Sequence, residues 1–423
     1  MSLLKEPGAK AFYAVIFLNA CVDLGHKITL QNTVFKIYDG TPQIILAAFI
    51  NALIILPYIF LVLPIGRVAR RYPKPEIIRA AALTSLFLTL LIALCYQRGW
   101  FYLALAMTLL MAIQSAFYAP AKLAYLRLLF GVDQLSRSNG LAQAVVIAGI
   151  LLGTLLFSLG FEWRYVLLPS TVLVLEAQLL QGQVLQLMVP LALALVLLAA
   201  LQLYCAVRIP RREEPLSQAV EQSVPASDVS LLFSQRALLL PVLGLALFWS
   251  IGQGMLAVFP AFAKQYAGIG NAALIQAVLA TTALGTAAGA YLAARWSPQG
   301  VRLSLAVMGF FSLAVGLWLL PLLRHPLAFV GDYFFLGIAS GMIIVPLNAC
   351  LQMRAAPALL GGVLAGSQCL QNIAMLAMLL LTISAALLQL DSRNLLQFMA
   401  LLTSFLGELL SLLLLRSSRA AHR

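Results

Sequence analysis

Three side chains that can carry charge lie close together in an apolar stretch near the start of the chain. Asp23, His26 and Lys27 fall within residues 11–37, which otherwise hold few charged groups. At spacings i, i+3 and i+4 they share one side of a helix. Charges deep in a membrane helix are costly and usually face a cavity or a partner. Two interpretations remain open: a self-neutralising Asp23–Lys27 ion pair, and a substrate-lining or gating role.

Further polar side chains interrupt apolar segments later in the chain. Lys122 is placed close to the end of a predicted helix over 100–126, where snorkelling to the interface competes with a role in substrate binding. The second half offers four uncharged candidates, three of them at helical spacing on one face: Asn348, Gln368, Gln371 and Asn372. We expect these residues to contribute to a substrate site, although most embedded amides only join neighbouring helices.

Motifs of enzyme chemistry are absent from the sequence. There is no Gly-x-x-x-x-Gly-Lys phosphate loop and no Gly-x-Ser-x-Gly nucleophile turn. The three histidines and five cysteines show no metal-ligand spacing. The sequence therefore predicts a protein that is not an enzyme and that needs no cofactor and no metal.

The elements that must position these residues are membrane-spanning helices. The chain has 423 residues, of which 62% are hydrophobic and 10% charged, against about 45–50% and about 25% in soluble domains. A spanning helix needs about 20 apolar residues, and helix is the only plausible structure for such long runs. Twelve helices are predicted, at about 11–37, 44–66, 77–97, 100–126, 138–161, 187–207, 237–263, 271–294, 301–322, 326–350, 358–390 and 394–415.

A polar stretch divides these helices into two groups of six. We expect an N-terminal half over 1–207, a cytoplasmic linker over 208–236 and a C-terminal half over 237–423. Residues 164–186 are too often interrupted by polar residues to span, and are interpreted as an interfacial or re-entrant segment on the outer side. The alternative is that they extend the sixth helix as a loop.

The surplus of positive charge follows the rule that basic residues remain inside. Most Lys and Arg residues fall on one side when both termini are placed in the cytoplasm. The net charge of +13 is thereby explained without a nucleic-acid partner. We predict a multi-pass protein of the bacterial inner (cytoplasmic) membrane.

A weak repeat relates the two halves. Pro120-Ala121-Lys122 with Arg127 corresponds to Pro346-Leu347-Asn348 with Arg354. Parallel six-helix repeats with a midplane site are the plan of major facilitator transporters, which the chain resembles. The all-α major facilitator fold is therefore expected.

The resemblance extends to residues that gate such transporters. The loop expected between the second and third helices partly matches a major facilitator latch motif, with Gly66 and Arg71 in place but Arg70 where an Asp is usual. An ordinary basic loop explains it nearly as well. Gly153 is expected to let helices approach and slide.

A narrower resemblance covers nearly all twelve helices. The segments AFYAPAKLAYLRLL (116–129), LSRSNGLAQAVVIAGILLG (135–153), LFWSIGQG (247–254) and GIASGMIIVPLNACLQMR (337–354) resemble the bacterial lysophospholipid transporter family, LplT. The resemblance implies flipping of lysophosphatidylethanolamine-type lipids by alternating access, for reacylation by a cytoplasmic-side acyltransferase. Leu256 and Gln371 stand where the family commonly has Arg and Glu, so the head-group preference is open.

Two other functions remain as alternatives. One is a proton-coupled exporter of amphiphilic drugs or other small molecules on the same fold, with Asp23 as the coupling carboxylate. The other is a non-transporting scaffold or scramblase-like partner of a lipid acyltransferase. The sparse charge of both halves favours an amphiphile among membrane lipids over a hydrophilic sugar.

Overall fold

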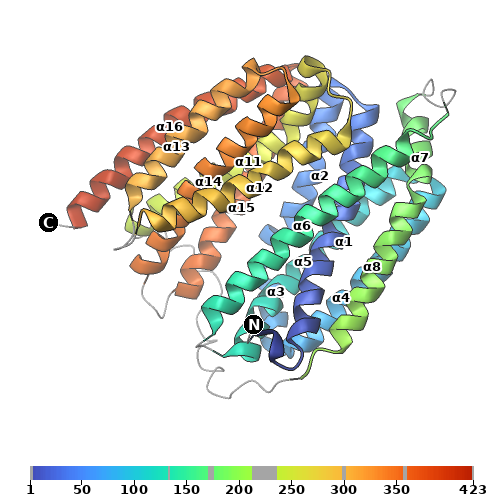
Figure 1. The fold of residues 1–423 in the computed structure, drawn as a ribbon, viewed down its shortest axis with the longest axis horizontal. Coiled ribbons are helices and arrows are strands. Elements are labelled where there is room, and N and C mark those ends of the chain that lie inside the picture. The colour runs from blue at the N-terminus through green and yellow to red at the C-terminus, as the bar shows by residue number, and fades with distance from the viewer. Residues whose placement is uncertain are drawn as a thin grey trace. The chain divides into compact units, whose positions relative to one another are not determined.

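The chain is a helical membrane protein in every part that the structure describes. The computed structural model describes residues 3–131, 134–169, 176–211, 236–297, 302–355 and 360–421, and these ranges contain helices and no strand (Figure 1). Within them, twelve helices are long and apolar enough to cross a membrane. The predicted all-α class and the predicted number of spans are thus confirmed.

Contacts along the chain group the residues into two compact units. Unit 1 comprises Met1–Tyr38 and Leu56–Ser223, and unit 2 comprises Asp39–Ile55 and Val224–Arg423. The predicted linker over 208–236 falls mostly in 212–235, outside the described residues. The boundaries expected for the two six-helix halves therefore stay a prediction.

Unit 1 is built around its first helix. α1 packs mainly against α6 and α8, and α4 packs against α5 and α8. The helices of this unit, together with α2, which begins in unit 2, are α1 (Ala9–Ile37), α2 (Gly40–Phe60), α3 (Val62–Arg71), α4 (Lys74–Arg98), α5 (Phe101–Phe130), α6 (Leu135–Tyr165), α7 (Ala177–Leu187) and α8 (Val189–Val207).

Small residues bring α1 and α6 together. A Cβ atom added at Gly149 would lie 2.7 Å from the carbonyl oxygen of Phe17, and one at Gly153 would lie 3.1 Å from the Cα of Cys21. The Cys21 thiol also donates to the carbonyl of Gly149 at 3.3 Å. Close approach through small residues four apart is a recurrent way of packing membrane helices.

The second predicted helix and the loop after it differ from expectation. Instead of one helix over 44–66 followed by a loop, α2 ends at Phe60 and α3 continues to Arg71. Pro64 has no N–H to donate to the carbonyl of Phe60, which accounts for the break. α3 then ends because Pro73 forces Tyr72 into an extended conformation.

The basic end of unit 1 is held together by hydrogen bonds to carbonyls at and just beyond the end of α8. The Arg79 guanidinium donates to the carbonyls of Ile209, at 2.6 Å, and Ala206, at 3.4 Å. The Tyr125 hydroxyl donates to the carbonyl of Pro210 at 2.9 Å. Ala206 is in the last turn of α8 and Ile209 and Pro210 follow its end, so these contacts fix the chain where α8 ends.

The opposite end of unit 1 holds the segment interpreted as non-spanning. Within it, α7 has 11 residues and is about 16 Å long, which is too short to span the bilayer. The Tyr38 hydroxyl donates to the Gln181 side chain of α7 at 2.8 Å, and α7 also contacts α1 and α4. Beside it, Lys36 of α1 pairs with Glu162 of α6 at 2.9 Å. α7 is therefore docked on the bundle, and its predicted outer location stays a prediction.

Unit 2 is organised around a tight pair of helices. The unit contains α11 (Arg236–Ala267), α12 (Ala272–Arg295), α13 (Leu303–Leu319), the short η2 (Leu320–Leu322), α14 (Pro326–Arg354), α15 (Leu360–Leu387) and α16 (Ser392–Ala421). α12 and α14 cross at Gly285, Gly289, Gly337 and Gly341. A Cβ atom at any of these four positions would collide with backbone atoms of the facing helix.

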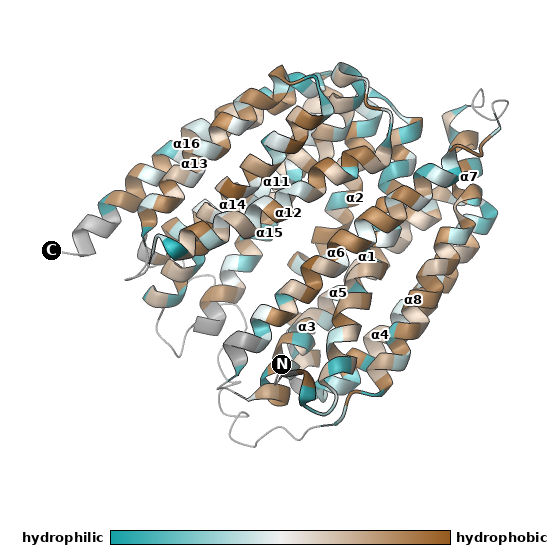
Figure 2. Ribbon diagram, in the orientation of Figure 1, coloured by the Kyte–Doolittle hydropathy of each residue, from teal (hydrophilic) through white to brown (hydrophobic). Residues whose placement is uncertain are grey.

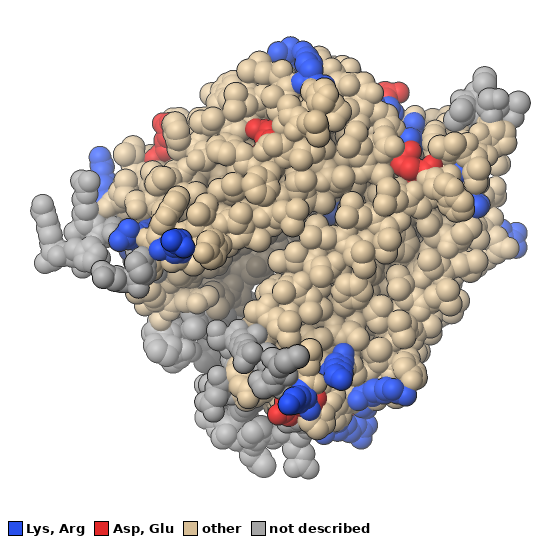
Figure 3. All heavy atoms as spheres, viewed as in Figure 1, with Lys and Arg blue, Asp and Glu red and all other residues tan. Residues whose placement is uncertain are grey.

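Apolar side chains cover the outside of the helices. Large hydrophobic groups such as Phe60, at 72% relative exposure, and Leu197, at 71%, face outward. Figure 2 shows apolar colour along the length of the helices, and in Figure 3 the visible Lys, Arg, Asp and Glu atoms lie mainly toward the helix ends. Such a surface suits contact with lipid chains.

Candidate functional site

Asp23 is held by hydrogen bonds near the middle of α1. It lies fourteen residues after the start of this 29-residue helix, about 21 Å along its length. Its Oδ2 atom accepts from the Asn19 amide at 2.9 Å and from the Ser115 hydroxyl. Its Oδ1 atom is buried with no hydrogen-bond partner among the described residues. One carboxylate oxygen is therefore fixed, and the other is free to accept.

The hydrogen bonds of Asp23 continue into three other helices of unit 1. Asn19 accepts from the Gln202 amide of α8 at 3.0 Å. On α5, the Ser115 hydroxyl lies 3.2 Å from Gln114 Oε1, and the Gln114 amide donates to the carbonyl of Ala81 on α4 at 3.1 Å. Hydrogen bonds inside a protein are stronger when each partner is itself hydrogen-bonded, so the network fixes the Asp23 side chain.

Lys122 lies deeper than its predicted position. α5 runs to Phe130 instead of ending near 126, which places Lys122 eight residues, or about 12 Å, from the helix end. Its ammonium is 5.6 Å from the centre of the Tyr118 ring, and Lys122 lies two turns along α5 from Ser115, which donates to Asp23. The structure thus brings Lys122 and Asp23 together without a direct ion pair between them.

His26 points away from Asp23 into the packed interior. It is 1% exposed, with Nδ1 3.2 Å from the Tyr96 hydroxyl and Nε2 3.1 Å from the carbonyl of Ala104. These partners on α4 and α5 occupy both ring nitrogens. Its predicted binding role stays a prediction, and the contacts seen here join three helices.

Lys27 is only partly buried, and the described residues offer it no ion pair with Asp23. The two acceptor contacts of Asp23 come from neutral groups instead. The self-neutralising pair, one of the two interpretations open from sequence, is therefore not formed. Lys27 remains a candidate cation on the same helix.

The candidates of unit 2 are satisfied mainly within their own helices. Asn348 donates to the carbonyl of Ile344 at 3.0 Å on α14. On α15, Gln371 donates to the Ser367 hydroxyl at 2.8 Å, and Gln368 lies 3.4 Å from Asn372. Gln371 and Asn372 are buried, whereas Gln368 is exposed. These three side chains form a polar stripe on α15, and their role in binding stays a prediction.

The residues predicted to gate transport occupy different environments. Gly66 and Arg71 belong to α3, and the Arg71 guanidinium lies 5.8 Å from the centre of the Tyr72 ring. Nothing is described of the Arg70 side chain. Gly153 packs against the backbone of Cys21 on α1. A latch at α3 and a sliding contact at Gly153 stay predictions.

Two features of the structure were missed from sequence. Asn19 and Ser115, the direct partners of Asp23, are ordinary polar residues in apolar runs, and only the i−4 spacing of Asn19 could have indicated its contact. Asp332 on α14 is also buried, and its Oδ2 atom has no partner among the described residues. Its signal was available, because an acid within the predicted helix 326–350 is rare in a membrane span.

The chain resembles transporters in sequence and in fold. It is 27% identical over 335 residues to the lysophospholipid transporter LplT of Photorhabdus laumondii, covering 77% of this chain and 76% of that protein. It is 29% identical over 283 residues to LplT of Klebsiella pneumoniae, and this match spans 64% of each chain. The crystal structure of the nucleoside transporter NupG shares the fold, with a TM-score of 0.67, 10% identity and coverage of 96% of this chain and 98% of that one.

A family model matches most of the chain. Residues 14–379 fit the Major Facilitator Superfamily, a range that includes Asp23, Lys122 and the polar stripe on α15. The twelve helices agree with this match, which indicates a transporter rather than an enzyme. The chain therefore belongs to the Major Facilitator Superfamily.

Proposed function

We propose that this protein transports lysophospholipids, moving lysophosphatidylethanolamine-type lipids across the bacterial inner membrane by alternating access. The observation that carries the proposal is the likeness to LplT transporters over about three quarters of both chains, with 77% of this chain and 76% of the Photorhabdus laumondii protein aligned. Both termini and the linker over 208–236 are placed in the cytoplasm, on the strength of the positive-inside rule.

The site in unit 1 has the chemistry that such a head group requires. The Oδ1 atom of Asp23 is buried and without a partner among the described residues, so it would accept from an ethanolamine ammonium once the site opens during transport. Lys122, and Lys27 one turn beyond Asp23, are cations for the phosphate, which a Lys binds as a point charge. The fixed Oδ2 atom keeps the carboxylate in one orientation, so binding does not have to order it.

The acyl chain needs an apolar environment rather than further polar groups. Few charges occur in the spans, and large hydrophobic side chains cover their outer surface. A lipid chain can therefore remain in hydrocarbon while the head group passes the polar site. We expect the product to enter the cytoplasmic leaflet, where a lysophospholipid acyltransferase converts it to a diacyl lipid.

Transport of head-group-labelled lysophosphatidylethanolamine into proteoliposomes tests the proposal. Uptake should be saturable, and unlabelled lysophosphatidylethanolamine should compete with it. Uptake with and without a protonophore then tests proton coupling. Absence of lysolipid uptake, together with protonophore-sensitive movement of an amphiphilic drug, would favour the alternative exporter function.

The step after transport needs its own measurement. In spheroplasts, labelled lysolipid should appear as diacyl phospholipid only when both this protein and the acyltransferase are present. Conversion that continues at an equal rate after deletion of this protein would remove the proposed link to reacylation.

A further inference from the structure

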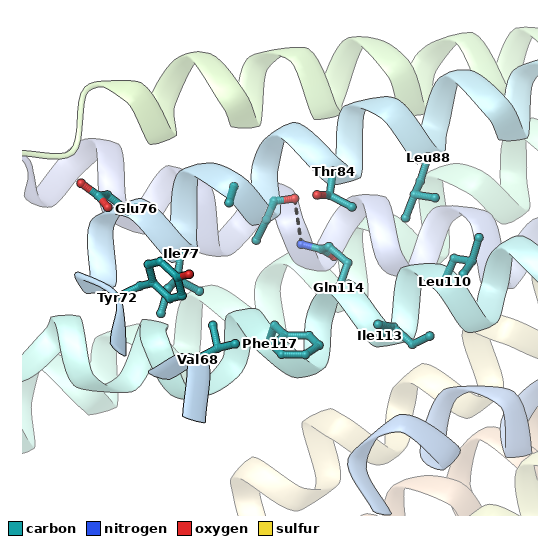
Figure 4. Close-up of a pocket in the computed structure, with 12 residues that line it drawn as sticks. Val68, Tyr72, Glu76, Ile77, Thr84, Leu88, Leu110, Ile113, Gln114 and Phe117 are labelled. Carbon is teal, nitrogen blue, oxygen red and sulfur yellow. Dashed lines mark hydrogen bonds between the residues drawn. The ribbon is translucent and has the colours of Figure 1, made fainter. Parts of the chain in front are cut away.

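An elongated apolar groove lies on unit 1 between α3, α4 and α5 (Figure 4). Its volume is about 580 Å³, which falls within the range of about 300–1,000 Å³ typical of ligand pockets. Residues of all three helices line it, and they are predominantly apolar: Val68, Tyr72, Glu76, Ile77, Ala80, Ala81, Thr84, Leu88, Leu110, Ile113, Gln114 and Phe117.

The groove is about as long as one leaflet of the membrane is thick. The lining residues from Glu76 to Leu88 run for about 18 Å along α4. Half of the hydrocarbon core of a bilayer is about 15 Å thick. The lining residues follow one stripe of α4 and one of α5, at spacings of one, three and four residues. One stripe on each helix offers a wall for one extended acyl chain.

The mouth of the groove carries charges of both signs. Glu76 lines the groove at its basic end and pairs with the Arg211 guanidinium at 2.9 Å. Both side chains are accessible, with 39% and 71% exposure. A zwitterionic head group has a phosphate for the Arg and an ammonium for the Glu. The opposite charges at the mouth are therefore complementary to such a head group.

The inner wall of the groove is connected to the site around Asp23. Gln114 lines the groove and donates to the carbonyl of Ala81, as the dashed line in Figure 4 shows. Its other end meets the Ser115 hydroxyl, which donates to Asp23. Gln114 thus belongs both to the wall of the groove and to the polar network.

We propose that this groove binds the single acyl chain of a zwitterionic lysophospholipid, with the head group at the Glu76–Arg211 pair. The inference rests on the proposed function, because it assigns the groove to the transported lipid at a stage of transport separate from that in which the head group lies at Asp23 and Lys122. The ligand is defined by chemistry: one chain, a phosphate and an ammonium.

Photolabelling of the full-length protein in nanodiscs tests the proposal. The probe is lysophosphatidylethanolamine with a diazirine at the end of its chain, and labelled peptides are located by mass spectrometry. Label should concentrate in peptides covering 77–88 and 110–117. Label confined to other helices would overturn the assignment, as would equal labelling by a diacyl phosphatidylethanolamine with the same diazirine.

Variants that fill the groove sharpen the test. Ala80 and Thr84 line it and are exposed, so Ala80→Trp and Thr84→Trp should reduce labelling at least fivefold without disturbing the core. Leu83 is on the same helix, 57% exposed and outside the groove. Leu83→Trp is the matched control and should label like the wild type. Equal labelling of all three variants would contradict the proposal.

The head-group contact is tested separately. Glu76→Gln should lower labelling by the lysophosphatidylethanolamine probe at least threefold, because the ammonium loses its carboxylate. The exposed Glu176 provides the control variant Glu176→Gln. Unchanged labelling of Glu76→Gln would overturn the placement of the head group.

Labelling reports binding and does not require transport. Wild-type protein that takes up lysolipid but carries no label in the groove would overturn the groove inference and leave the proposed function intact. Specific labelling in the groove without any lysolipid uptake would support the groove and overturn the proposed function.

Discussion

Replacing Asp23 by Asn should separate transport from stability. The Asn side chain keeps the size of Asp, and its oxygen can accept from Asn19 and Ser115 as Oδ2 does now. The change removes the negative charge and turns the free acceptor, Oδ1, into a donor. The fold should therefore tolerate Asp23→Asn, whereas an ammonium head group loses its partner.

The expected sizes of the two effects differ. Hydrogen bonds between membrane helices contribute about 0.6 kcal/mol on average, so weaker bonds to Asn19 and Ser115 should change the free energy of unfolding by less than about 1 kcal/mol. A hydrogen bond to a charged group contributes about 1.5–3 kcal/mol. Since about 1.4 kcal/mol corresponds to a factor of ten, uptake should fall about 10- to 100-fold.

The assay measures lysophosphatidylethanolamine uptake per folded molecule, beside the unfolding temperature of the same preparation. Asp332→Asn serves as the control, because it neutralises another buried carboxylate within a span and should leave uptake within about twofold of the wild type. Wild-type uptake by Asp23→Asn would refute the role of the charge. A large loss of folded protein with normal uptake by the remainder would show that Asp23 acts only on stability.

Three further substitutions follow from the packing of unit 1. Gly153→Leu should destabilise the α1–α6 contact by about 1–3 kcal/mol and slow uptake, whereas Gly140→Leu, with open space around it, should change neither in thermal unfolding and uptake assays. His26→Ala should lower the free energy of unfolding by about 1–3 kcal/mol, because two buried groups lose their partner, and wild-type thermal stability would contradict this. Lys122→Gln should abolish most uptake at unchanged folded yield, with partial recovery in Lys122→Arg, and equal uptake by both variants would exclude a phosphate contact.

The helices could be predicted from sequence because hydrophobic length decides them. Twelve apolar runs were long enough to span, and the structure has spans at all of them. The helix ends were harder, because apolar residues do not mark them. The break after Phe60 depends on the missing N–H of Pro64, which lies inside the predicted helix 44–66. The end of α3 depends on Pro73, which lies in the loop expected after that helix. Hydropathy indicates neither.

The candidate site could be predicted only in part, because residues on the same face of a helix can contact different neighbouring helices. Relative to Asp23, His26 is rotated about 60° one way and Lys27 about 40° the other. The neighbouring α4 and α5 take His26 into the interior, whereas Lys27 stays partly exposed. Tertiary packing decides which side of a helix its neighbours cover, and the positions of Asp23, His26 and Lys27 in the sequence do not reveal it.

The close crossing of α12 and α14 leads us to expect that these two helices move as one rigid body. Because the two backbones meet at four glycines, no side chain separates the helices at the crossing, and we expect them to move together. Spectroscopic labels attached to the outer faces of both helices should keep a constant separation while the transporter changes state. The pair would then serve as a fixed reference for measuring the movement of the other helices of unit 2.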